Sequence, residues 1–240
     1  MSRAIVTATV AAAVAALGAL TTLGACAGDL DPPWQLDHDR IIAVRATPPG
    51  IARGETSTID ALLGQKGGPT RVAPPELATV VSPASLSDVL AFTGGAWVVS
   101  APGDARLDAA RAELKLPAGA PVPLRIGVSY AGQSLVATKT LLLGQAAQNP
   151  ALASVMLDGK AATPAELTVG KLVKVPLSVD ADDAHFDVTW LTSCGTMHDF
   201  DLPTAYLQVE VEDPDAGELA LVVRDDQAGV AWSVWPIHAE

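Results

Sequence analysis

Residues 122–143 have the sequence VPLRIGVSYAGQSLVATKTLLL, and this stretch decides the fold class. Apolar side chains occupy every second position from Val122 to Tyr130, and the positions between them are mostly polar or small. Strict alternation indicates a strand with one buried face. Residues 131–133 (AGQ) have the composition of a turn, and residues 135–143 are again rich in aliphatic side chains. We therefore predict an antiparallel β-hairpin here.

The hairpin belongs to a first module that we place at residues 36–144. Residues 41–44 (IIAV) predict an early strand, and residues 55–63 predict another with Ile59 and Leu63 on one face. The middle of this module is less regular. Residues 104–114 are rich in alanine and favour a helix, and residues 85–92 favour a second short helix. We expect a β-rich module with short helical insertions.

A second module at residues 151–240 follows a linker at residues 145–150. Apolar residues alternate with polar ones at 173–179, 186–190 and 206–212. Leu219, Leu221 and Val223 form the next set, and residues 230–237 return after a turn. Short strands separated by turns over about 90 residues are typical of a β-sandwich. The predicted fold class is therefore mainly β, with two β-sandwich modules.

Two features of the second module resemble immunoglobulin-like domains. Trp190 falls in the third strand, where those domains place a core tryptophan, and residues 215–221 (DAGELAL) resemble their Asp-x-Gly-x-Tyr-x-Cys motif. Leu219 and Leu221 stand at the tyrosine and cysteine positions, so the resemblance implies neither the tyrosine corner nor the intersheet disulfide. Pro176 departs from the pattern, since a central strand would lose one ladder bond there.

The first module resembles bacterial immunoglobulin-like repeats at Pro48-Pro49, at Gly54-Glu55 and at the hairpin near residue 130. The two resemblances together imply two immunoglobulin-like β-sandwich modules, the first with short helical insertions.

The N-terminal residues predict a signal peptide at residues 1–25. Arg3 is followed by the uncharged run 4–23, which is long enough to span a membrane but only weakly apolar. Residues 23–26 (LGAC) resemble the lipobox of bacterial lipoproteins. The resemblance implies cleavage before Cys26 and attachment of lipid to its thiol, so residues 26–35 would be a lipidated tether.

The same resemblance predicts the location. Ala27 follows the cysteine, whereas aspartate there favours retention in the inner membrane of enterobacteria, so we expect the outer membrane. The whole chain is similar to uncharacterised surface lipoproteins of high-GC Gram-negative bacteria. This similarity implies a protein of the cell envelope whose first partner is the membrane, reached through the lipid on Cys26.

Charge excludes one class of partner. The chain has 15 Lys and Arg against 27 Asp and Glu, a net charge of −12. Such a chain lacks the basic surface that polyphosphate requires, so we expect no nucleic-acid partner. If Cys26 carries lipid, Cys194 has no disulfide partner within the chain.

Catalytic motifs are scarce. The sequence contains no His-Glu-x-x-His, no Gly-x-Ser-x-Gly and no phosphate-binding loop. Cys194 and His198 lie close together, which leaves open an envelope enzyme with its site there. The other interpretation is a loop after a strand with a half-buried cysteine. We expect no enzyme and no cofactor, apart from the Ca²⁺ considered next.

Five aspartates form a candidate Ca²⁺ site. In an immunoglobulin-like order, two loops at one end of the sandwich carry them, Asp180, Asp182 and Asp183 in one and Asp225 and Asp226 in the other. Converging carboxylates are the ligands that Ca²⁺ prefers. Ordinary solvated turns are the alternative, since aspartate is a common turn residue.

Trp232 and Trp235 lie on opposite faces of one predicted strand, so only one of them enters the core. The other either faces a ligand or packs against the first module. We expect a lipid-anchored envelope protein that acts as a binding or structural module. The alternatives are the enzyme with a site near Cys194 and His198, and a subunit of a surface or secretion assembly with other envelope proteins as partners.

Overall fold

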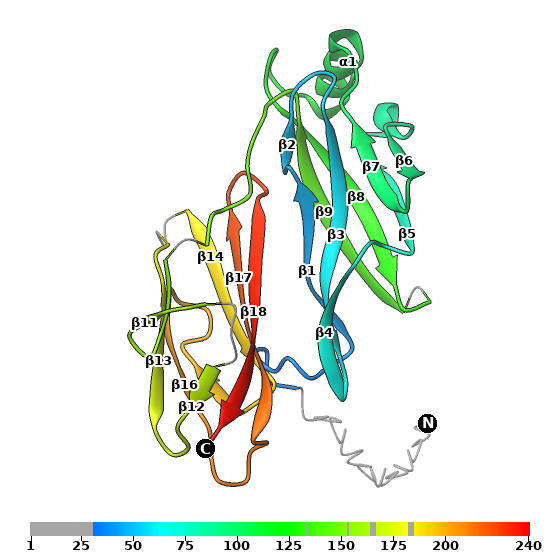
Figure 1. Ribbon diagram of the computed structural model, residues 1–240. Helices are drawn as coiled ribbons and strands as arrows, with labels where there is room; N and C mark the ends of the chain where they lie inside the picture. The colour runs from blue at the N-terminus through cyan, green and yellow to red at the C-terminus, as the bar shows by residue number, and fades with distance from the viewer. Residues whose placement is uncertain (1–30, 133, 153, 164–166, 182–184) are drawn as a thin grey trace, which may run out of the picture. The chain divides into compact units, whose positions relative to one another are not determined.

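The computed structural model describes residues 31–132, 134–152, 154–163, 167–181 and 185–240 (Figure 1). The predicted signal peptide and Cys26 lie outside these residues. Residues Pro32–Glu240 form one compact unit. Strands dominate this unit, which confirms the predicted fold class. No helix in the described part of the chain is both long and apolar enough to cross a membrane.

Two sheets form the first module. Its strands are β1 (Arg40–Thr47), β2 (Gly50–Ile51), β3 (Thr56–Gln65), β4 (Gly68–Ala73), β5 (Leu77–Ser82), β6 (Leu90–Thr93), β7 (Ala96–Ser100), β8 (Val122–Tyr130) and β9 (Leu135–Leu143). One sheet has the order β1-β3-β7-β6, with β4 also paired to β3, and the other has the order β2-β9-β8-β5. The predicted hairpin is β8–β9, in antiparallel register from Val122 opposite Leu143 to Tyr130 opposite Leu135.

The two helical predictions have different outcomes. Helix α1 (Asp104–Leu114) has the predicted bounds, and Leu107 and Ala110 are its buried residues. The helix predicted at residues 85–92 is wrong, because only a short 3₁₀ turn (Ala84–Leu86) forms there and β6 follows it. The reason is the dipeptide Gly94-Gly95, whose φ angles of 60° and 83° make a tight turn and fold β6 back onto β7.

The second module also has two sheets. Its strands are β10 (Val155–Leu157), β11 (Lys160–Ala161), β12 (Leu167–Val169), β13 (Lys174–Val179), β14 (Phe186–Thr192), β15 (Thr196–His198), β16 (Thr204–Gln208), β17 (Ala216–Asp225) and β18 (Val230–Ala239). The sheets have the orders β11-β10-β13-β16-β15 and β12-β18-β17-β14. The strand predicted at residues 206–212 ends earlier, at Gln208. The chain turns after it, where the Glu210 amide donates to the Asp213 carboxylate at 2.8 Å.

The two modules repeat one order of strand pairing. In the first sheet of each, the order β1-β3-β7-β6 corresponds to β10-β13-β16-β15. In the second sheet, β2-β9-β8-β5 corresponds to β12-β18-β17-β14, and a short strand pairs in parallel with the last long strand of the module in both cases. This is the strand order of an immunoglobulin-like sandwich.

Trp190 lies in the core of the second module, as the resemblance implies. Its side chain is fully buried, and its indole N–H donates to the Leu202 carbonyl at 3.1 Å. Leu219 and Leu221 are buried in the same cluster, so aliphatic packing replaces the missing tyrosine and cysteine. Pro176 is tolerated in β13 because the missing N–H lies beyond the end of the neighbouring strand. Its carbonyl accepts from the Asp158 amide, just after β10 ends, and the nitrogen of the same residue faces the same side.

Candidate functional site at the module junction

An apolar cluster joins the two modules. The first module contributes residues of β1, β3 and the segment before them, and the second contributes the outer face of the β14-β17-β18 sheet: Leu36, Ile42, Ala43, Leu62, Leu191, Ala220, Val222 and Val230. Strand β17 is consequently buried on both faces over residues 219–223 (LALVV). A continuous apolar run is the sequence signal for such a strand. The sequence predicts one buried face with Leu219, Leu221 and Val223. In the structure Ala220 and Val222, on the other face, are buried as well.

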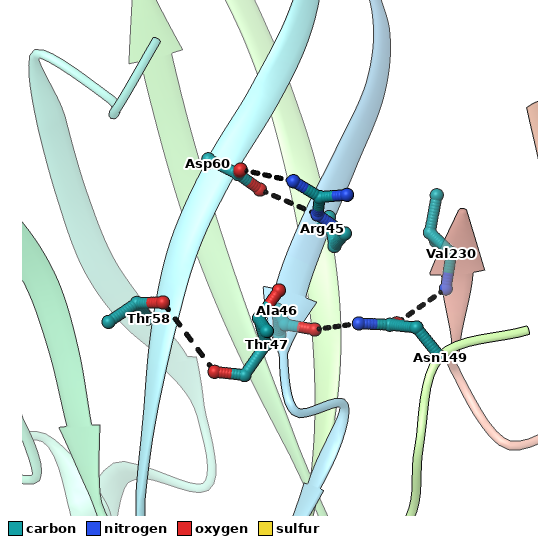
Figure 2. A network of polar contacts seen from close by, with 7 residues as sticks. All are labelled: Arg45, Ala46, Thr47, Thr58, Asp60, Asn149 and Val230. Atoms are coloured by element: carbon teal, nitrogen blue, oxygen red, sulfur yellow. Dashed lines mark hydrogen bonds and ion pairs between the residues drawn. The ribbon is translucent and has the colours of Figure 1, made fainter. Parts of the chain in front are cut away.

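Polar contacts continue this junction (Figure 2). Asn149 of the linker donates from Nδ2 to the Ala46 carbonyl at 2.9 Å and accepts at Oδ1 from the Val230 amide at 2.8 Å. One side chain therefore bonds to both modules. Nearby, Arg45 makes two hydrogen bonds to Asp60, at 3.1 and 2.6 Å.

The chain also contacts the second module before it enters the first. The Leu36 amide donates to the Thr192 carbonyl at 2.8 Å, and the Thr192 amide donates to the Trp34 carbonyl at 3.0 Å. Trp34 packs against the core of the second module. Trp34 and Gln35, which the sequence analysis assigned to the tether, therefore lie against the end of β14.

A cleft of about 540 Å³ lies at the junction, lined by β1, β9, β14, β17 and the turn before β18. Two cations line it. Lys139 is only 5% exposed, and its ammonium donates to the Ala228 carbonyl at 2.6 Å. Arg224 donates from Nη2 to the Ile42 carbonyl at 2.9 Å and from Nη1 to Thr189 Oγ1 at 3.2 Å. Each cation therefore donates a hydrogen bond from its own module to the other one.

Sequence reasoning missed these two residues, although each leaves a signal. Lys139 lies an even number of residues from Leu141 and Leu143, so it shares their inward face of β9. Its long aliphatic stem can stay among apolar neighbours while the ammonium reaches the edge. Arg224 lies on the same face of β17 as Ala220 and Val222, which is the face that the first module covers.

The two candidate tryptophans have separate positions. Trp235 is 4% exposed and lies in the core of the second module. Trp232 is partly buried in the junction cluster, with the Arg45 guanidinium carbon 3.9 Å from the centre of its ring. Trp232 therefore packs against the first module, which is the alternative to a ligand-facing ring.

The candidate Ca²⁺ ligands are only partly described. Asp182 and Asp183 lie outside the described residues. Phe186 pairs with Asp225, which brings the loop before β14 and the turn after β17 to one end of the sheet. Asp225 Oδ1 accepts from the Gln227 amide at 2.9 Å and the Gly229 amide at 2.5 Å, as in an ordinary aspartate turn.

Asp180 and Asp226 are exposed. Among the residues that the structure describes, no three His, Cys, Asp or Glu side chains gather as a metal would need. The Ca²⁺ site stays a prediction.

Cys194 and His198 do not form a reactive pair in this geometry. The Cys194 thiol is fully buried and donates to the Pro214 carbonyl at 2.9 Å, and burial raises its pKa. The thiolate is the nucleophilic form, so such an environment disfavours catalysis. The His198 ring is stacked on Tyr206 instead, with 4.4 Å between ring centres.

The chain has only distant similarities to known proteins. No protein-family model matches the chain, and no curated protein sequence matches it. Among solved structures, murine CEACAM1b is 13% identical, with a TM-score of 0.28, over 82% of this chain and 100% of that one.

Two further solved structures are similar at the same level. The tandem Ig repeats of Dlar are 12% identical, with a TM-score of 0.30, over 82% of this chain and 97% of that one. The fibronectin(III)-like modules of Clostridium thermocellum CbhA are 14% identical, with a TM-score of 0.29, over 82% and 94%.

A nucleoside hydrolase-related hypothetical protein from Saccharophagus degradans is 13% identical, with a TM-score of 0.29. Only 36% of this chain matches it, and the match spans 25% of that protein. Because these similarities are low, the fold assignment rests on the strand order given above: the chain is an immunoglobulin-like β-sandwich protein.

Proposed function

We propose that this chain is a lipid-anchored protein of the cell envelope whose two immunoglobulin-like modules act together as a binding or structural unit. The observation that carries the proposal is the sequence Leu23-Gly24-Ala25-Cys26 at the end of an uncharged run. Only a few residues separate Cys26 from the compact unit that begins at Pro32. A lipid on that cysteine would hold both modules close to the membrane surface.

Metabolic labelling with an alkyne fatty acid tests the anchor. We expect label on the wild-type chain and on Cys194→Ala, which is the matched control because it removes the other cysteine. Cys26→Ser should carry no label and should leave the membrane fraction. Equal label on the wild type and Cys26→Ser would contradict the proposal. Density separation of the two membranes tests the outer-membrane location.

A subunit of a surface or secretion assembly is a second candidate, favoured by an aliphatic face on the first module. Leu77, Val81 and Val136 are 47%, 54% and 74% exposed. Leu77 and Val136 line a groove of about 550 Å³ on the β5-β8-β9 sheet. Exposed aliphatic patches are typical of protein contacts.

Crosslinking of intact cells, followed by purification of the lipoprotein, tests this second candidate. A specific envelope partner should be recovered with the wild type and lost with Val136→Asp. Val211→Asp is the control, because Val211 is 60% exposed in the other module. Equal recovery with both variants would remove the groove as the contact.

A further inference from the structure

Lys139 is buried and Arg224 is partly buried, and both cations line one cleft. Within the described part of the chain, they donate hydrogen bonds to neutral oxygens, the carbonyls of Ala228 and Ile42 and the hydroxyl of Thr189. Among the residues that the structure describes, neither cation has a carboxylate within ion-pair distance. A cation with little access to water is costly unless an anion compensates it, so these two side chains favour a bound anion.

The cost appears in the proton affinities of both groups. The pKa of Lys139 is lowered to about 8, mainly by burial and also by the nearby Arg224 charge, while Asp225 and Asp60 oppose the shift. Burial also lowers the pKa of Arg224 below its ordinary value, and Asp187 opposes that shift. An anion bound between the two side chains would relieve both.

The cleft is also lined by the carboxylates Asp187, Asp225 and Asp226, none of which lies within ion-pair distance of either cation. Asp187 and Asp226 are exposed, so water and salt screen them strongly. Asp225 accepts two backbone amides at Oδ1, and Asp60 is bonded to Arg45. Water and salt screen a charge with little exposure less than they screen an exposed one.

We infer that the junction cleft binds the compact anionic group of a small ligand, a carboxylate or a phosphate, between the Lys139 ammonium and the Arg224 guanidinium. An ammonium has three N–H donors and a guanidinium has five, so most remain for a ligand after the bonds described above. The cleft volume of about 540 Å³ is in the range of small-molecule sites. The inference gives a ligand class to the proposed binding role and rests on that role.

Calorimetric titration of the full chain in detergent, with inorganic phosphate and with succinate as probes, tests the site. We expect saturable binding of at least one probe to the wild type. Lys139→Met and Arg224→Met should each weaken it at least tenfold. Arg125→Met is the matched control, because Arg125 is an exposed cation of the first module, and it should bind as the wild type does. Binding of one probe alone identifies the anion class.

Dependence on pH gives a second readout that needs no variant. Succinate stays fully ionised above pH 7, so its affinity for the wild type should fall between pH 7 and pH 10 as Lys139 loses its proton. At pH 8, binding should take up protons, which titrations in two buffers of different ionisation enthalpy measure. This result stands even if a variant fails to fold.

Three results would overturn the inference: no saturable binding of either probe, unchanged binding in both Met variants, or binding without proton uptake at pH 8. None of them touches the lipid anchor, which the labelling of Cys26 tests separately.

Discussion

Lys139 is a buried cation whose contribution to stability depends on pH. Its pKa is about 8 in the folded chain against an ordinary value of 10.5. Between these values the unfolded chain keeps the proton and the folded chain releases it, so the free energy of unfolding rises with pH. Below pH 8 the cost of the buried charge is fully present, and it amounts to at most about 3 kcal/mol.

Urea unfolding at several pH values tests this consequence. The difference in free energy of unfolding, wild type minus Lys139→Met, should increase from pH 7 to pH 10. Lys66→Met is the control, since Lys66 is exposed in the same module, and its difference should stay flat. A flat difference for Lys139→Met as well would show that the lysine is not buried as described.

Cys194 should be unreactive while the protein is folded. Its thiol is buried, donates to the Pro214 carbonyl and has a raised pKa, so little thiolate forms at pH 8. In the Cys26→Ser chain, Ellman's reagent should modify no thiol in buffer and one thiol in urea. Fast modification of the folded chain would revive the enzyme alternative near Cys194 and His198.

At the scale of elements, tight glycine turns determine where strands pair. Gly94 has a φ of 60° in the β6–β7 turn, with nothing within 4 Å of an added Cβ. Gly195 has a φ of 86° between β14 and β15, and a Cβ there would lie 2.5 Å from the Gln208 carbonyl oxygen. Gly94 is required only for its left-handed conformation, whereas Gly195 is also required because a Cβ would collide with the Gln208 backbone.

Alanine at the two positions separates these effects. We expect Gly94→Ala to lower the free energy of unfolding by about 1 kcal/mol, the cost of a left-handed alanine. Gly195→Ala should cost clearly more, because the Gln208 backbone must also move. Chemical denaturation measures both, and equal costs would contradict the close approach at Gly195.

Local patterns predicted most elements but not all of their partners. The alternation in residues 122–143 predicts β8 and β9, and the alanine-rich run predicts α1 with its correct bounds. Gly94-Gly95 and Asp158-Gly159 mark two hairpins that the sequence analysis overlooked. Strand β15 has three residues, too few for a period to be visible.

At the scale of the whole molecule, the candidate site was beyond local sequence patterns. Lys139 and Arg224 are 85 positions apart in sequence numbering and meet only because the first module covers the outer face of β17. The apolar run at residues 219–223 indicates a second buried face, but periodicity does not say which segment covers it.

The central claim is that the two sandwiches share a buried junction and therefore unfold together. Differential scanning calorimetry of the Cys26→Ser chain tests it most directly. We expect one transition, with equal calorimetric and van't Hoff enthalpies. Val222→Asp buries a charge in the junction and should split this transition into two, whereas Val211→Asp, at an exposed position, should leave it single. Two transitions in the parent chain, both unchanged by Val222→Asp, would contradict the account.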